Sequence, residues 1–303
     1  MSLSNVGLGM QQIPTFMILA ICEMILASLS YAGPSGETYT IDSGDCHQCT
    51  YHRQPQLFSG QPGLLGDKLG QILPGRPNKI DLYFLGFAGN GDEPVFANEV
   101  RFAEKRIAEE YSTDGRSAVL TSSIHNADSQ PLASTQNLFR SISDIGKKMD
   151  AEDDILFLFL SSHGWNDATL QVTVGDLPLK HLRGSDLGAT LDAAGIRWRI
   201  IVISGCYTGS FIEPLKTRWT VIMTAASAEN VSYGCDPDND LTDFGRALFE
   251  DAIGSGNGLL EDFRKARSII AKREKLDAVT PSRPQTYVGF DMEQKLNQLS
   301  NSL

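Results

Sequence analysis

Two stretches of sequence decide the fold: ILFLFLSSHGW at residues 155–165 and RIIVISGCYTGSF at residues 199–211. Each contains a continuous apolar run, which is typical of a parallel strand buried on both faces. Each run then gives way to small and polar residues that include His163 in the first stretch and Cys206 in the second. Because the carboxyl ends of parallel strands meet at one edge of a sheet, we expect these two side chains to face a common site.

The sequence around these runs alternates between strand and helix patterns. Continuous apolar runs predict buried strands, and apolar residues at helical spacing predict helices. The predicted strands cover residues 79–87, 118–121, 155–160, 198–204 and 219–225, and the predicted helices cover residues 96–111, 134–149, 185–194, 243–253 and 259–273. Such alternation predicts an α/β fold, with a mainly parallel sheet and helices on both of its faces.

The composition narrows the class of protein. The 303 residues include 26 Lys and Arg against 37 Asp and Glu, a formal net charge of −11. This acidic excess argues against a nucleic-acid-binding protein, which needs a basic face. With 41% hydrophobic and 21% charged residues, the chain has enough apolar material for a folded core. We expect one main domain and a separate N-terminal segment.

The N-terminal segment has a composition of its own. Residues 16–32 (FMILAICEMILASLSYA) are apolar and end in small residues, which predicts a signal peptide or membrane anchor over residues 1–32. We expect export to the periplasm or the extracellular space, or membrane association through residues 13–32. No Lys or Arg precedes Arg53, whereas a secretory signal normally starts with basic residues. Residues 33–78 are rich in Gly, Pro, Ser and Gln, and we expect them to be irregular.

The five cysteines are too few and too scattered for a disulfide scaffold. Cys46 and Cys49 flank His47 and a glutamine, and His52 follows, so residue types that bind zinc lie close together. No second Cys-x-x-Cys or His pair completes a structural site. We therefore expect a disulfide or two surface thiols there, and no metal or other cofactor.

A histidine and a cysteine at neighbouring strand ends are the groups that nucleophilic catalysis needs. A thiolate is a strong nucleophile, and a nearby imidazole can take the thiol proton and later return a proton to a leaving amine. The N–H groups of Gly164 and Cys206 are candidates for an oxyanion hole. Residues 205–209 also fit a nucleophile elbow, but the α/β-hydrolase fold places its histidine after the nucleophile, and no histidine follows Cys206.

These motifs resemble those of a known family. SSHGW and ISGCYTGSF are similar to the two catalytic motifs of clan CD cysteine peptidases. MTAASAENVSYGC at residues 223–235 is similar to the segment that follows them in the legumain family, peptidase family C13. PQTYVG at residues 284–289 resembles the tail of bacterial members. The resemblance covers roughly residues 79–296.

The resemblance implies a caspase-like three-layer α/β sandwich over residues 79–303. It implies a cysteine endopeptidase that cleaves peptides or proteins through a thioester acyl-enzyme, with Cys206 as nucleophile and His163 as general base and acid. The amides of Gly164 and Cys206 would form the oxyanion hole. Ser232 and Asp243 match positions of the family's substrate pocket, although an acidic residue such as Asp243 can also serve a helix N-terminus.

The departures from the legumain pattern concern specificity. Legumains carry Asn-Tyr-Arg-His after the first strand, whose Arg and His help to recognise Asn or Asp, whereas this chain has no cation in residues 90–96. Ser204 stands where legumains have an acidic residue, and Ser162 replaces an Asp. These changes argue against cleavage after Asn or Asp and favour a neutral or differently charged P1 residue. Asn90 is a candidate to orient His163, although Asn-Gly more often forms a turn.

Two other functions fit the same motifs. A transpeptidase or transamidase would use the same acyl-enzyme and resolve it with an amine. A catalytically silent module would keep the fold and only capture peptides. The reactivity of Cys206 separates the silent module from both enzymes, because a catalytic thiol alkylates rapidly at neutral pH.

Overall fold

The computed structural model describes residues 29–32, 38–41, 47–121, 123 and 126–302. The chain divides into two compact units, Met1–His52 and Arg53–Leu303. In the first unit, strands β1 (Leu29–Ala32) and β2 (Thr38–Ile41) form an antiparallel hairpin. The predicted signal peptide or anchor falls mainly on residues 1–28, outside the described residues. None of the helices that are described is long and apolar enough to cross a bilayer.

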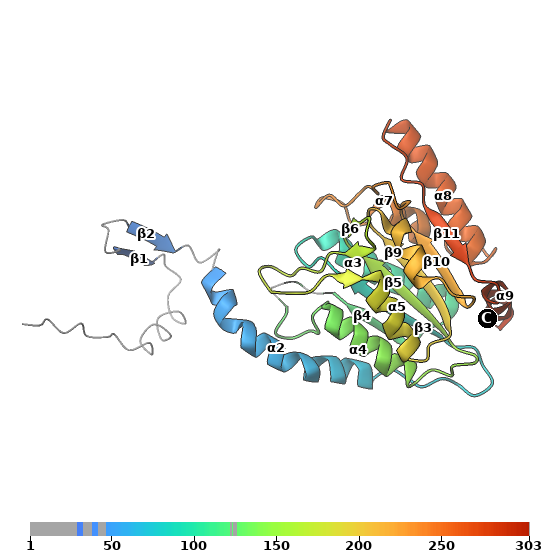
Figure 1. Ribbon diagram of the computed structural model, residues 1–303, viewed down its shortest axis with the longest axis horizontal. Coiled ribbons are helices and arrows are strands. Elements are labelled where there is room, and N and C mark those ends of the chain that lie inside the picture. The colour runs from blue at the N-terminus through green and yellow to red at the C-terminus, as the bar shows by residue number, and fades with distance from the viewer. Residues whose placement is uncertain (1–28, 33–37, 42–46, 122, 124–125, 303) are drawn as a thin grey trace, which may run out of the picture. The chain divides into compact units, whose positions relative to one another are not determined.

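A six-stranded sheet forms the centre of the second unit (Figure 1). Its order is β11-β10-β9-β5-β3-β4, and every neighbouring pair is parallel except β10 with β11. The strands are β3 (Leu82–Ala88), β4 (Ser117–Leu120), β5 (Ile155–Ser161), β9 (Trp198–Ser204), β10 (Thr220–Thr224) and β11 (Gln285–Val288). The expected mainly parallel sheet is therefore present.

Helices cover both faces of this sheet, so the unit is a three-layer sandwich. One apolar core contains residues of α3 (Pro94–Tyr111), η2 (Arg246–Glu250), α8 (Leu259–Leu276) and α9 (Met292–Ser302). The opposite core contains residues of α2 (His47–Gly70), α4 (Thr135–Gly146), α5 (Gly184–Ala193) and α6 (Ile212–Leu215). The α/β sandwich expected from the sequence is confirmed.

The continuous apolar runs follow from this layering. Along β5, residues 155, 157 and 159 lie in the first core and residues 156, 158 and 160 lie in the second. Because side chains alternate between the two faces of a strand, a strand covered on both sides needs apolar residues at every position. Full burial of each such side chain contributes about 1.5–3 kcal/mol.

The structure differs from the sequence-based expectation between residues 33 and 78. Helix α2 occupies much of this segment, and its residues Leu65 and Leu69 are buried in the second core together with Ile72. Several glycines and prolines dilute the helical pattern there, whereas three apolar residues at helical spacing suffice to dock the helix. The compact unit therefore begins at Arg53, before the predicted boundary at residue 79.

Short elements at the strand ends were also absent from the prediction. Strands β6 (Gly164–Trp165), β7 (Thr169–Leu170) and β8 (Leu182–Arg183) form a small sheet after β5. A 3-10 turn, η1 (Thr208–Phe211), follows β9. The helix predicted over residues 243–253 is a short helix, α7 (Asp243–Gly245), that runs into the π-helical η2. Elements this short carry too few residues to show a period.

Candidate active site

His163 and Cys206 follow two adjacent strands whose ends are aligned. Ser161 at the end of β5 lies opposite Ser204 at the end of β9, and the Ser162 N–H donates to the Ser204 carbonyl over 3.1 Å. A Cβ atom on Gly164 would clash with the Cys206 carbonyl oxygen. The loop that carries the histidine and the loop that carries the cysteine therefore touch, backbone against backbone.

His163 is held by a carboxylate that the sequence analysis did not identify. Its Nε2 lies 2.9 Å from Oε1 of Glu93, and its ring meets the Phe96 ring edge-on with centroids 5.0 Å apart. The imidazole is 34% exposed. Because a carboxylate only accepts hydrogen bonds, Nε2 carries the proton of this contact, and the lone pair of a neutral ring lies on Nδ1.

Asn90 contacts Glu93, the carboxylate that lies against His163. Its amide Nδ2 donates to Glu93 Oε1 over 3.3 Å and to Gln171 Oε1 over 3.1 Å. Its Oδ1 accepts the backbone N–H groups of Asp92 and Glu93. Asn90 thus forms the turn that its Asn-Gly sequence suggests and also orients the carboxylate that contacts His163.

Cys206 contacts the loop that follows β10. Its sulfur accepts the Ser232 N–H over 3.4 Å and lies 3.6 Å from the Ser232 carbonyl oxygen and 3.9 Å from the Ser232 hydroxyl. The thiol is partly exposed. The next residue, Tyr207, has a left-handed backbone with φ of 58°, and its N–H donates to the Asn230 carbonyl. A sharp turn thus places the partly buried Cys206 beside Ser232.

The Gly164 N–H lies outside the hydrogen-bond ladder of the small sheet. Gly164 pairs with Leu170 in the small sheet, and the ladder bond runs from the Gln171 N–H to the His163 carbonyl over 2.8 Å. In this register Gly164 and Leu170 form a non-hydrogen-bonded pair, so the Gly164 N–H is directed away from β7. Gly164 itself is buried against the loop that carries Cys206.

A buried carboxyl lies beneath both loops. Glu99 of α3 is 0% exposed and accepts hydroxyl hydrogen bonds from Ser161, Ser204 and Thr242. Burial raises the pKa of the Glu99 carboxyl above its usual value, and these hydrogen bonds oppose the rise. Glu99 ties together the ends of β5 and β9, two residues before His163 and Cys206.

The three predicted substrate contacts occupy different places. Ser204 is only 1% exposed and its hydroxyl bonds to Glu99 and Thr242, so it is closed to solvent and supports the strand ends from below. Ser232 contacts the Cys206 sulfur. Asp243 opens α7, where its N–H bonds to the Tyr233 carbonyl.

A second thiol lies near the site. Cys235 is partly exposed, and burial raises the pKa of its thiol, with further contributions from Cys206 and Glu93. The expected disulfide or surface thiols at Cys46 and Cys49 lie outside the residues whose side chains the structure describes. In the part of the chain that the structure describes, no group of three or more His, Cys, Asp and Glu side chains is arranged to hold a metal ion.

Comparison with known proteins agrees with the motifs. The model of the peptidase C13 family matches residues 138–294, about half of the chain, and this segment contains both His163 and Cys206. Caspase-1 from Spodoptera frugiperda has a similar structure, with a TM-score of 0.52 and 12% sequence identity over 72% of this chain and 94% of that chain. At this identity the likeness concerns the fold. No curated protein matches the sequence.

Proposed function

The chain belongs to the peptidase C13 family, and from this premise we propose that it is a cysteine endopeptidase in which Cys206 and His163 form the catalytic dyad. Family and fold together support a cysteine-peptidase type of function. The observation that carries the finer proposal is the contact between the two loops at the ends of β5 and β9. It brings a partly exposed imidazole and a partly exposed thiol to one edge of the sheet.

The proposed reaction begins with transfer of the Cys206 thiol proton to Nδ1 of His163. The sulfur attacks the scissile carbonyl carbon, and the N–H groups of Gly164 and Cys206 stabilise the negative oxygen. The C–N bond then breaks as His163 returns the proton to the leaving amine, which leaves a thioester. Water, activated by His163, hydrolyses the thioester and releases the acid and the thiol.

Glu93 fits a supporting role in this sequence. Its carboxylate accepts a hydrogen bond from Nε2–H, so the neutral ring keeps its lone pair on Nδ1, and the same carboxylate stabilises the imidazolium that forms when Nδ1 takes a proton. Glu93 stands in the loop where legumains have their Arg and His, so a negative side chain replaces the cations that recognise Asn or Asp. This supports a P1 residue other than Asn or Asp.

The experiment that tests the proposal is turnover of a fluorogenic peptide library varied at P1, with the full chain and three variants. Cys206→Ala and His163→Ala should each abolish turnover without lowering the melting temperature. Cys235→Ala, which removes the neighbouring thiol, should retain most of it. Full turnover in Cys206→Ala would exclude the proposed nucleophile. Addition of an amine such as a glycine peptide separates hydrolysis from transpeptidation, because a transpeptidase forms the ligated product.

We further propose that residues 1–32 direct export or anchor the chain in a membrane. Fractionation of producing cells, with mass spectrometry of the mature N-terminus, tests this proposal. A full-length chain in the soluble cytoplasmic fraction would contradict it.

A further inference from the structure

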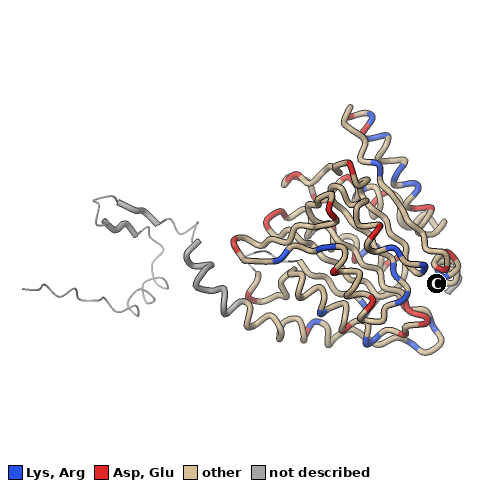
Figure 2. The backbone as a smooth tube through the Cα atoms, in the orientation of Figure 1, with Lys and Arg blue, Asp and Glu red and all other residues tan. Residues whose placement is uncertain are grey.

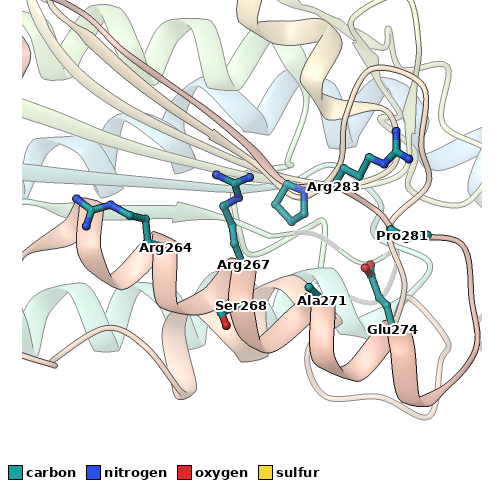
Figure 3. A pocket seen from close by; sticks show the side chains of 8 residues that line it. Arg264, Arg267, Ser268, Ala271, Glu274, Pro281 and Arg283 are labelled. Atoms are coloured by element: carbon teal, nitrogen blue, oxygen red, sulfur yellow. The ribbon is translucent and has the colours of Figure 1, made fainter.

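A groove lined by arginines lies next to the candidate site. It has a volume of about 330 Å³ between helix α8 and residues 281–284. Arg264 and Arg267 project from α8, and Arg283 comes from the facing segment with its side chain pointing away from that of Arg267 (Figure 3). Pro281 and Pro284 also line the groove. We call this feature the arginine groove.

The arginine groove is positively charged although the chain is acidic overall. Arg264 is paired with Glu261. For Arg267 and Arg283, the structure gives no ion-pair partner within the part of the chain whose side chains are described. Blue segments recur along α8 in Figure 2. The one carboxyl in the lining, Glu274, is already engaged by the Ser282 N–H over 2.9 Å. The groove therefore offers two guanidinium groups to an anionic ligand.

The segment that carries Arg283 is tied to the loop beside Cys206. The Ser227 N–H donates to the Ser282 carbonyl over 2.9 Å, and the Tyr233 hydroxyl donates to the Thr280 carbonyl over 2.8 Å. Ser227 and Tyr233 lie at the two ends of the stretch that contains Ser232, the residue in contact with the Cys206 sulfur. The segment that forms one wall of the arginine groove is thus hydrogen-bonded to the loop that contacts the Cys206 sulfur.

The sheet order shows which half of a substrate reaches the groove. Along the active edge, His163 follows β5, Cys206 follows β9, residues 225–232 follow β10, and residues 281–284 precede the antiparallel β11. Since His163 delivers a proton to the leaving amine, the leaving half lies on the β5 side and the acyl half extends over β10 toward β11. Two strand spacings of about 4.8 Å separate β9 from β11, and an extended peptide advances about 3.3 Å per residue. The groove is therefore about three residues from the scissile bond.

We propose that the arginine groove binds acidic side chains three and four residues N-terminal to the scissile bond, one at Arg267 and the other at Arg283. The inference rests on the proposed peptidase function and adds the substrate class, an acidic peptide. A substrate of this kind uses a specificity contact remote from the P1 residue.

Paired tetrapeptide coumarin amides test the proposal, with the P1 residue that the full chain cleaves best. Peptides with Glu at P3 and P4 should be cleaved about twofold to fivefold faster than the Gln isosteres, because partly exposed ion pairs have about this effect. Arg267→Gln and Arg283→Gln should each remove part of the preference, and 1 M NaCl should reduce it. The matched control Lys272→Gln, an exposed cation of α8 outside the groove, should leave it unchanged. The Arg283→Glu protein should cleave peptides with Lys at P3 and P4 faster than peptides with Glu there.

Two outcomes separate this inference from the proposed function. Cleavage that depends on Cys206 but shows no preference for Glu over Gln contradicts the proposed role of the arginine groove, whereas the proposed peptidase function stands. Absence of Cys206-dependent cleavage contradicts the proposed peptidase function. Peptide binding by the arginine groove is then tested by calorimetry, which measures the affinity of the Cys206→Ala protein for acetyl-Glu-Glu-Ala-Ala-amide and for its Gln counterpart. Tighter binding of the acidic peptide that is reduced in Arg267→Gln supports the groove, and equal binding of the two peptides overturns it.

Discussion

Replacement of the buried Glu99 by alanine should destabilise the protein and weaken the site above it. The side chain joins the hydroxyls of Ser161, Ser204 and Thr242. Each buried hydroxyl left without its partner costs about 1–3 kcal/mol, although Ser204 and Thr242, 3.1 Å apart, can bond to each other. The cavity left by the lost side chain adds about 1–2 kcal/mol. We therefore expect Glu99→Ala to cost about 2–5 kcal/mol.

Glu99→Gln is the matched control, because it keeps the volume and lets one hydroxyl accept from the new amide. We expect it to cost about 1 kcal/mol. For a unit of this size, 1 kcal/mol corresponds to about 2–4 °C in melting temperature, so Glu99→Ala should melt roughly 10 °C below the wild type. Peptidase activity should fall further in Glu99→Ala than in Glu99→Gln, since the strand ends beneath His163 and Cys206 lose their common anchor.

The pH dependence provides a second test of the same reasoning. Burial raises the pKa of the Glu99 carboxyl in the folded state, so its contribution to stability is full below the unfolded pKa of about 4.3. That contribution is lost as the pH rises through the higher folded pKa. The melting temperature of the wild type should therefore fall, relative to that of Glu99→Gln, from pH 4.5 toward neutrality. Thermal unfolding followed by circular dichroism measures both effects. A Glu99→Ala protein that melts within 2 °C of the wild type, or parallel pH profiles for wild type and Glu99→Gln, would refute the reasoning.

Three further predictions concern the catalytic loops. Glu93→Gln should lower kcat about 10-fold to 100-fold with little change in KM or melting temperature, because it removes the negative charge beside His163 without disturbing the core. An unchanged kcat in steady-state kinetics would contradict this prediction. Gly164→Ala places a methyl group against the Cys206 carbonyl and should cost about 1–3 kcal/mol as well as most activity; a normal melting temperature with full turnover would argue against the loop contact. Iodoacetamide at pH 7 should modify Cys206 before Cys235, whose pKa is raised by burial and neighbouring charge, and peptide mapping that finds Cys235 first would reverse the assignment.

Much of the fold could be predicted from local patterns. The strand expected over residues 198–204 coincides with β9, and the run at residues 155–160 lies within β5. Continuous apolar runs are visible in a sequence because each strand is buried on both faces. Helix α2 was missed because its glycines and prolines weaken the helical pattern, and docking of Leu65 and Leu69 on the second core compensates for that composition. Strands β6, β7 and β8 have two residues each, too few for any periodic pattern.

The site shows the same division between local and distant information. The sequence alone predicted that His163 and Cys206 lie at one edge of a sheet, because both follow apolar runs typical of buried parallel strands. That β5 and β9 are neighbours in the sheet came from the structure. Only the tertiary structure decided the partners of these residues: Glu93 reaches His163 from the loop after β3, and Glu99 reaches Ser161 and Ser204 from α3. These contacts join residues that are far apart in the chain and depend on how α3 packs against the sheet. An apolar run in a sequence predicts its own burial, whereas an acidic residue in a sequence does not predict which side chain its carboxylate will contact.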